Sequence, residues 1–207
     1  MATNSNLVRR LRSSLTFNTL QQAVLIGSIL GDGHLSSNIT EGRINSRLQI
    51  AHSEKQRTYV FWKYRIFSDW VLSPPKYVKA NHSWRFRTLS HPELTAMRSL
   101  FYFNRKKIIP LNIDNILIKP LSLAVWIMDD GFRKGKKGLS LCTHSFSPEE
   151  VGLLRDCLYE NFGLESTIHW DGKGHEIHFP SPMRNKLLGL VGKIVIPSLQ
   201  YKLPIAP

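Results

Sequence analysis

A short apolar motif that ends in Asp-Gly occurs once in each half of this chain of 207 residues. Leu25–Gly33 reads LIGSILGDG, and Leu123–Gly131 reads LAVWIMDDG. After each motif, a polar and strand-like stretch ends in His-Ser, at residues 52–53 and 144–145. An internal repeat constrains the fold strongly, because each copy must form the same supersecondary unit. The chain is therefore predicted to build one unit twice, in tandem.

Local signals after the His-Ser pairs predict the next elements of each unit. Residues 53–56 and 147–150 both place Ser three positions before Gln or Glu, which is typical of a capping box at a helix start. In the second copy, Asp171–Gly174 separates the strand-like residues 167–170 from residues 175–179. This pattern predicts a β-hairpin.

The first copy carries a weaker hairpin signal, and both copies close alike. Residues 77–79 and 84–89 are strand-like and flank a short polar turn, and Lys107–Pro110 and Lys202–Pro204 close the two copies. Each unit is thus predicted as αββαββα, and the fold class as α+β with antiparallel sheets. The predicted boundaries are a basic N-terminal extension over 1–18, a first unit over 19–112, a linker over 113–119 and a second unit over 120–207.

The charge balance predicts the class of partner. Lys and Arg number 28 against 15 Asp and Glu, which gives a net charge of +13. A surplus of this size favours nucleic acid, because each contacted phosphate releases condensed counterions. No apolar run reaches the roughly 18 residues of a membrane span. Cys142 and Cys157 form no CxxC pair, so neither a disulfide framework nor a zinc finger is predicted.

The first twenty residues contain Arg9, Arg10 and Arg12 and no acidic residue. This composition resembles a transit peptide. It is equally typical of a basic arm or of a short upstream extension, and composition alone leaves these three interpretations open.

The first motif is predicted to be a helix with a face of small residues. It runs over residues 19–31, with Asn18 as the N-cap. Ala23, Gly27 and Gly31 recur every four residues and so share one face. Small side chains there allow a second helix to approach closely, and the second motif is the candidate partner.

If the two motif helices pack side by side, Asp32 and Asp130 come together at their C-terminal ends. Gly33 and Gly131 follow, where a left-handed residue commonly ends a helix. An acid beside a helix C-terminus is unfavourable, and two adjacent acids also repel each other. Mg²⁺ removes both penalties, and metal-bound carboxylates beside a phosphodiester favour its hydrolysis by water. The alternative is that Asp-Gly merely ends each helix.

These residues resemble the LAGLIDADG homing endonucleases, in particular the single-chain, two-motif type encoded in organellar introns. The resemblance rests on the motif pair, the repeat and shared sequences at residues 70–75 (WVLSPP), 126–131 (WIMDDG) and 201–204 (YKLP). It implies two units related by pseudo-twofold symmetry, with the motif helices at the central interface and the two sheets forming a saddle over duplex DNA. Because the twofold arrangement is completed within one chain, a monomer is expected.

The resemblance also implies the roles of individual residues. Asp32 and Asp130 are implied to bind catalytic Mg²⁺, with help from the backbone carbonyls of Gly31 and Asp129, and Mn²⁺ is expected to substitute. The basic residues of the family's active site map onto Lys107 and Lys202, which would stabilise charge on the phosphate. Two residues separate Lys107 from the proline that follows it, whereas one residue separates Lys202 from its proline. The spacing between lysine and proline therefore differs between the two copies.

DNA recognition is expected from the strands and from a cationic turn. Alternation places Arg47 and Gln49 on one strand face, and Arg85 and Arg87 on another. Such side chains can read bases or bind phosphate. The expected DNA-binding residues are Arg47, Gln49, Arg85, Arg87, Arg133, Lys134, Lys136, Lys137 and His175.

The resulting hypothesis is a site-specific endonuclease that cuts both strands of a long DNA target, leaves short 3′ overhangs and promotes intron homing. The chain would be encoded in an intron of a mitochondrion or chloroplast. Two alternatives stay open: an RNA-binding maturase that helps its host intron to splice, and a DNA-binding regulator on the same scaffold. Retention of both Asp32 and Asp130 favours cleavage.

Overall fold

The computed structural model describes residues 6–36 and 45–205. The chain divides into two compact units. Unit 1 holds the described residues up to 22 together with residues 33–98, and unit 2 holds residues 23–32 together with the described residues from 99 onward. Helix α2 (Thr19–Leu30) therefore begins in unit 1 and ends in unit 2.

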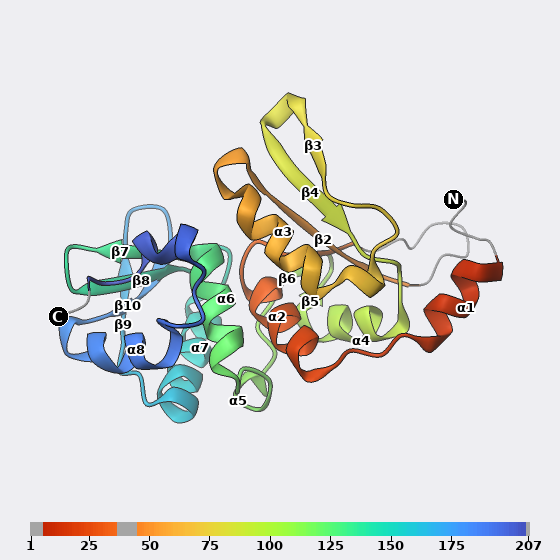
Figure 1. Ribbon diagram of the computed structural model, residues 1–207. Coiled ribbons are helices and arrows are strands. Elements are labelled where there is room, and N and C mark those ends of the chain that lie inside the picture. Colours follow the sequence, from red (N-terminus) through yellow and green to blue (C-terminus); the bar gives the residue numbers. More distant parts are fainter. Residues whose placement is uncertain (1–5, 37–44, 206–207) are drawn as a thin grey trace. The chain divides into compact units, whose positions relative to one another are not determined.

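Unit 1 is built around a four-stranded antiparallel sheet with the strand order β1-β2-β4-β3 (Figure 1). Helix α3 contacts β2 and β4 on the apolar side of the sheet. Besides the start of α2, the unit contains α1 (Asn6–Ser14), β1 (His34–Ser36), β2 (Arg47–Ser53), α3 (Arg57–Ile66), β3 (Lys76–Val78), β4 (Ser83–Arg87) and most of α4 (Pro92–Phe101).

Unit 2 contains a second four-stranded antiparallel sheet with the equivalent order β7-β8-β10-β9. Its elements after α4 are β5 (Tyr102–Phe103), β6 (Lys106–Lys107), α5 (Ile113–Ile116), α6 (Pro120–Asp130), β7 (Gly131–Lys134), β8 (Gly138–Cys142), α7 (Pro148–Phe162), β9 (Thr167–Trp170), β10 (His175–Phe179), α8 (Arg184–Val191) and the 3₁₀ segment Pro197–Lys202.

The predicted αββαββα repeat is confirmed. The first copy runs α2-β1-β2-α3-β3-β4-α4, and the second runs α6-β7-β8-α7-β9-β10-α8. The two sheets have the same strand order, and each places its second and fourth strands side by side at the centre. Among the described residues, no helix combines the length and the apolar character needed to span a bilayer.

Strand alternation creates the cores on one face of each sheet. In unit 2, Leu139, Leu141, Ile177 and Phe179 are buried on adjacent strands, and helix α7 contacts β9 and β10. In unit 1, Leu48, Ile50 and Phe86 are buried in the same way, and helix α3, which contacts β2 and β4, buries Tyr59 and Val60. The opposite face of each sheet is left to polar side chains.

The N-terminal segment is packed into unit 1. The ring of Phe17 stacks on that of Trp70 at 3.7 Å between centroids and 4° between planes. Val8 and Leu15 are buried, and a ring nitrogen of His91 lies 3.1 Å from the Arg12 carbonyl oxygen. The described residues before α2 therefore contribute to the core of this unit.

Two of the three predicted helix caps are confirmed. Asn18 and Gln21 cap α2 reciprocally, since each side-chain oxygen accepts the other residue's backbone N–H. Ser147 and Glu150 form the predicted capping box of α7. The capping box at Ser53 was a wrong prediction, because β2 extends to Ser53 and a 3₁₀ turn then precedes α3.

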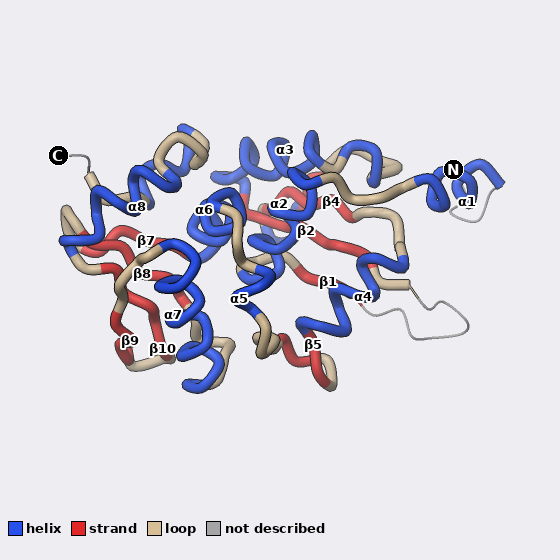
Figure 2. The backbone as a smooth tube through the Cα atoms, turned by 90° about the horizontal axis from the view of Figure 1, so that it is seen from below, coloured by secondary structure: helices blue, strands red, loops and turns tan. Residues whose placement is uncertain are grey.

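Within unit 2, α2 packs against α6 at very short range, as the small residues predict (Figures 1 and 2). A Cβ added to Gly27 would lie 2.3 Å from the Ser122 carbonyl oxygen and 2.6 Å from Val125 Cβ. No side chain larger than hydrogen fits at this position unless the helices separate. The close approach brings the C-terminal ends of the two motif helices together.

The prediction of left-handed glycines after the motifs was wrong. Gly131 has φ −74° and ψ 147°, which is extended backbone, and Gly33 is absent from the described residues with positive φ. Gly131 is needed for a different reason: an added Cβ would lie 2.5 Å from the Ile127 carbonyl oxygen. The chain passes directly from α6 into β7, and a side chain would block that path.

The substitution Gly27→Ala tests the helix contact. We expect it to destabilise the protein by about 1–3 kcal/mol, because the added methyl group overpacks a contact with backbone atoms. Gly152→Ala in α7 is the matched control, since its added Cβ meets nothing within 4 Å. The control should stabilise the protein by about 0.5 kcal/mol. Urea unfolding of both variants checks this, and equal effects of the two substitutions would contradict the close helix contact.

Candidate active site

The paired helix ends place the predicted acids in one cluster within unit 2. Asp130 is the last residue of α6, and Asp32 follows two residues after the end of α2. Carboxylate oxygens of Asp32 and Asp129 lie within 4.8 Å of each other. Asp32 and Asp129 are therefore close enough to share one cation, and the charges of both act on Asp130.

Each predicted lysine binds the carbonyl that precedes a motif acid. Lys107 Nζ donates to the Gly31 carbonyl oxygen at 2.7 Å, immediately before Asp32. Lys202 Nζ donates to the Asp129 carbonyl oxygen at 2.6 Å, immediately before Asp130, and to the Met128 oxygen at 2.7 Å. Ammonium groups are favourable at these positions because the carbonyls of a helix C-terminus carry partial negative charge. The structure thus brings together the predicted residues in two matching sets.

The side chain of Asp129 has a place in this cluster that the sequence analysis did not assign. It is only 7% exposed, and its Oδ2 accepts the backbone N–H of Asp32 at 3.1 Å. A Cβ added to Gly31 would lie 2.4 Å from Asp129 Cβ. Gly31 in the first motif therefore makes room for Asp129 in the second. The pairing of Gly with Asp at equivalent positions was the available signal.

The electrostatics of the cluster favour a bound cation. Burial raises the pKa of Asp130 from 3.8 to about 7, with further increases from the charges of Asp32 and Asp129. The charges of Lys107 and Lys202 lower this pKa, but they do not cancel the increase. Clustered carboxylates beside backbone carbonyls form a hard-oxygen donor set, which fits Mg²⁺ or a similar divalent ion. The residues present thus suit a divalent metal.

The polar face of the unit 1 sheet carries the predicted strand residues together. Gln49 lies opposite Arg87 in the register of β2 and β4, and Ala51 lies opposite Arg85. Arg47 lies on the same face as Gln49, because alternate residues of β2 are buried and exposed. Arg85 and Arg87 are exposed on β4.

In unit 2, the predicted basic residues are divided between the strand β7 and its turn. Arg133, Lys134, Lys136 and Lys137 are all exposed, and Gly135 makes the turn between β7 and β8 with a positive φ of 64°. Register places Lys134 on the polar face of the sheet and Arg133 on the other face, opposite Leu139.

His175 lies on the same sheet face as the buried Ile177. Its ring packs against that of Trp170, with 5.1 Å between the ring centroids. The polar face instead presents Glu176 and His178. His175 was predicted from the sequence to bind DNA, whereas these two neighbours were not. Alternation along β10 was visible in the sequence, but which alternate residues face the helices was decided by the packing.

Comparisons with known proteins agree with this fold. A sequence model of the LAGLIDADG DNA endonuclease family matches residues 22–187, a span that includes both motifs. The chain belongs to the LAGLIDADG DNA endonuclease family. The predicted membership is confirmed, and with it the class of enzyme.

Individual relatives cover almost the whole chain. A probable intron-encoded endonuclease 1 of Wickerhamomyces canadensis is 31% identical over 97% of this chain and 91% of its own length. The cytochrome b mRNA maturase bI2 of Debaryomyces hansenii is 29% identical over 87% of this chain and 72% of its own length. The solved structure of the homing endonuclease I-WcaI bound to its DNA recognition sequence is 28% identical, covers 100% of this chain and 96% of that chain, and superposes with a TM-score of 0.89.

The raised pKa of Asp130 predicts how stability depends on pH without metal. Because the folded-state pKa of about 7 exceeds the ordinary 3.8, the folded state binds more protons between these values, and stability falls as pH rises through that window. Asp130→Asn removes this dependence. In EDTA, the melting temperature of the variant should exceed that of wild type at pH 8. The difference should shrink as the pH falls from 7 towards 4. Thermal melts measure this difference in melting temperature. A difference that does not change with pH would contradict the raised pKa of Asp130.

Proposed function

We propose that this protein is a site-specific endonuclease that cuts both strands of a long double-stranded DNA target. The observation that carries the proposal is the duplicated set of acid, carbonyl and lysine: Asp32 with Gly31 and Lys107, and Asp130 with Asp129 and Lys202. Two matching sets in one chain suit a substrate with two strands of opposite polarity. A single structural role for Asp-Gly at helix ends does not explain why a lysine binds at each end.

Mg²⁺ is the cation we propose, with Mn²⁺ as a substitute. Asp32 and Asp130 would hold it, with the carbonyl oxygens of Gly31 and Asp129 as further ligands. When bound, such an ion lowers the pKa of a coordinated water and neutralises charge on a phosphodiester. Lys107 and Lys202 keep positive charge beside the acids, where it can stabilise the additional negative charge of the attacked phosphate. The burial of Lys202, at 8% exposure, holds its ammonium group in place.

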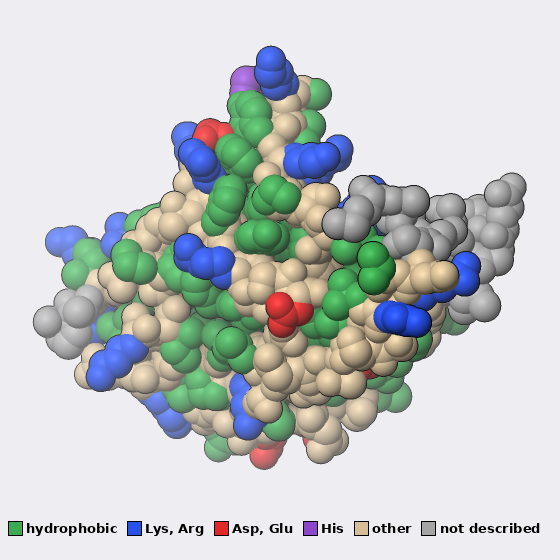
Figure 3. All heavy atoms as spheres, turned by 45° about the vertical axis from the view of Figure 1, so that its right-hand side comes forward, with side chains coloured by type: hydrophobic (Ala, Val, Ile, Leu, Met, Phe, Trp, Pro, Cys, Tyr) green, Lys and Arg blue, Asp and Glu red, His purple; other side chains and the backbone are tan. Residues whose placement is uncertain are grey.

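The polar faces of the two sheets are the proposed DNA-binding surfaces. Arg47, Gln49, Arg85 and Arg87 supply one of them, and the exposed lysines of the β7–β8 turn extend the other. Figure 3 shows Lys and Arg side chains spread over the drawn face, with few acidic side chains among them. A basic surface supplies affinity for any duplex, and side chains fixed on strands supply selectivity.

We infer the biological setting from the relatives. An intron-encoded endonuclease and a cytochrome b mRNA maturase both resemble this chain over most of its length. We therefore propose expression from an organellar intron, action as a monomer, short 3′ overhangs and promotion of intron homing. The maturase relative also supports a second candidate function, binding of the host intron RNA, which the same scaffold would perform with or without cleavage. The predicted division into residues 1–18, 19–112, 113–119 and 120–207 is retained as the proposed repeat organisation.

The experiment that tests the proposal is cleavage of a plasmid library that carries candidate intron-insertion sites and randomised sites, with Mg²⁺. Wild type should make discrete double-strand cuts, and Asp32→Asn/Asp130→Asn should reduce the rate by at least about 10²-fold, because the proposed metal ligands lose their charge. Uncut plasmid in EDTA is the control. Full cleavage by the double variant would contradict the roles of the acids. Absence of cutting, combined with tight binding of the host intron RNA in excess competitor DNA, would favour the maturase.

A further inference from the structure

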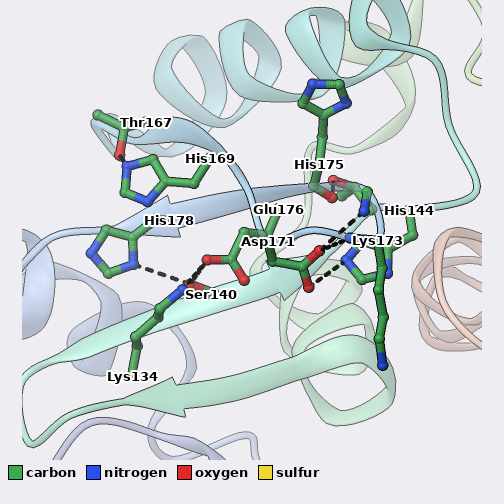
Figure 4. A network of polar contacts seen from close by, with 12 residues as sticks. Lys134, Ser140, His144, Thr167, His169, Asp171, Lys173, His175, Glu176 and His178 are labelled. Carbon is green, nitrogen blue, oxygen red and sulfur yellow. Dashed lines mark hydrogen bonds and ion pairs between the residues drawn. The ribbon is translucent and has the colours of Figure 1, made fainter.

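The polar face of the unit 2 sheet contains a carboxylate that is almost completely buried. Glu176 lies on β10 and is 1% exposed, although its alternation with Ile177 places it on the face away from the apolar core. An uncompensated acid on this face would repel DNA and would cost free energy to bury. Its contacts explain how it is accommodated, and they form the network in Figure 4.

Glu176 connects two neighbouring strands. Its Oε1 forms an ion pair with Lys134 Nζ on β7 and accepts a hydrogen bond from Ser140 Oγ on β8 at 3.4 Å. Ser140 Oγ also lies 3.1 Å from His178 Nδ1 on β10. The four side chains are thus linked from one edge strand to the centre of the sheet (Figure 4).

Residues of β9, the edge strand on the other side of β10, contact His178 and extend the network. The rings of His178 and His169 stack with 5.2 Å between centroids, and Thr167 Oγ1 lies 2.8 Å from His169 Nε2 on β9. Burial lowers the pKa of His178, and the charges of His169 and Lys134 lower it further, against a smaller opposing effect of Glu176. His178 is therefore neutral near pH 7, and its ring is held on both sides.

The hydrogen bonds of this network determine which donors and acceptors remain for a ligand. The Glu176 carboxylate, which is ion-paired with Lys134, accepts the single hydroxyl proton of Ser140. Ser140 then accepts from Nδ1–H of His178, which leaves Nε2 of the neutral ring as an acceptor. Lys134 uses one ammonium proton on Glu176 and keeps two, and its side chain is 47% exposed. Lys134 therefore offers donors and His178 offers one acceptor on the same polar face of the sheet.

Fixed groups of this kind suit bases better than phosphates. The ion pair with Glu176 offsets the charge of Lys134, which weakens its attraction for phosphate but restricts its position. The exposed Lys136 and Lys137 are better suited to backbone contacts. In the major groove, guanine O6 and N7 accept from lysine, while adenine N6 and cytosine N4 donate to an acceptor.

We propose that Lys134 and His178 read base edges in the major groove of the target, with Glu176 and Ser140 as the residues that position them. The partner is duplex DNA that presents a guanine to Lys134 and, at a nearby position, an exocyclic amine to His178. This inference rests on the proposed function and specifies how one half of the site is selected. It assigns Lys134 to base recognition and leaves phosphate contacts to Lys136 and Lys137.

The test compares Lys134→Met with Lys137→Met, a lysine of the same turn. Binding to the selected target is measured in EDTA at several salt concentrations, and position preferences are measured on a partly randomised target library. Lys134→Met should lose preference at one or two adjacent positions by about 10-fold and leave the salt dependence unchanged. Lys137→Met should leave the preferences unchanged and reduce the slope of log K against log salt by about 1.

Glu176→Gln tests the positioning role. It should relax the same positions as Lys134→Met, and the double variant should match Lys134→Met alone, because Glu176 acts through Lys134. A reduced salt slope with unchanged preferences in Lys134→Met would overturn the proposal and make this lysine a phosphate contact. Lys134 is exposed, so this decision does not depend on whether the buried substitution folds. A wild-type protein without any sequence preference would instead overturn the proposed endonuclease function, and this inference with it.

Discussion

The close contact between α2 and α6 at Gly27 determines the geometry of the candidate active site. Because a hydrogen atom replaces a side chain at this position, the two helices approach until Gly27 meets the backbone of Ser122. Their C-terminal ends then lie together, and Gly31 accommodates the side chain of Asp129 in the same way. A larger residue at either glycine would move the acids apart. The small residues of the first motif are thus a requirement of the site as well as of the packing.

This arrangement concentrates negative charge where helix ends already carry it. Three acids share the cluster with two lysines, and burial raises the pKa of Asp130 to about 7. Such a site is unfavourable without a cation, as is common for functional sites that sacrifice stability. Lys107 and Lys202 donate to the carbonyls that precede the acids, and their charges offset only part of the increase in the pKa of Asp130. The cost in stability and the proposed affinity for a divalent ion have the same electrostatic origin.

Much of the fold could be predicted because the repeat supplied each signal twice. The αββαββα order, the hairpin at residues 171–174, the Asn18 cap and the capping box at Ser147 all follow from local patterns. Ser53 also has the pattern of a capping box, but β2 continues through it and the next backbone N–H, that of Glu54, binds the His82 carbonyl across the sheet. A contact between residues distant in sequence overrides the local signal there.

The parts of the site that escaped prediction depend on tertiary contacts. The motif acids were identified from the repeat and both lysines from the family resemblance, and the structure pairs each lysine with one motif. The side chain of Asp129 was not assigned, because its role exists only when it lies over Gly31. Glu176 and His178 were passed over for a related reason: the sequence shows alternation along β10, whereas the register with Ser140 and Lys134 appears only in the folded sheet.

The central claim is that the paired helix ends form a metal site for DNA cleavage. A crystal structure of the protein with its selected target and Mn²⁺, with anomalous diffraction to locate the metal, tests it most directly. We expect anomalous density in contact with the carboxylates of Asp32 and Asp130, beside a phosphate of the target. Density at other residues, or none at these two acids with DNA bound in place, would contradict it.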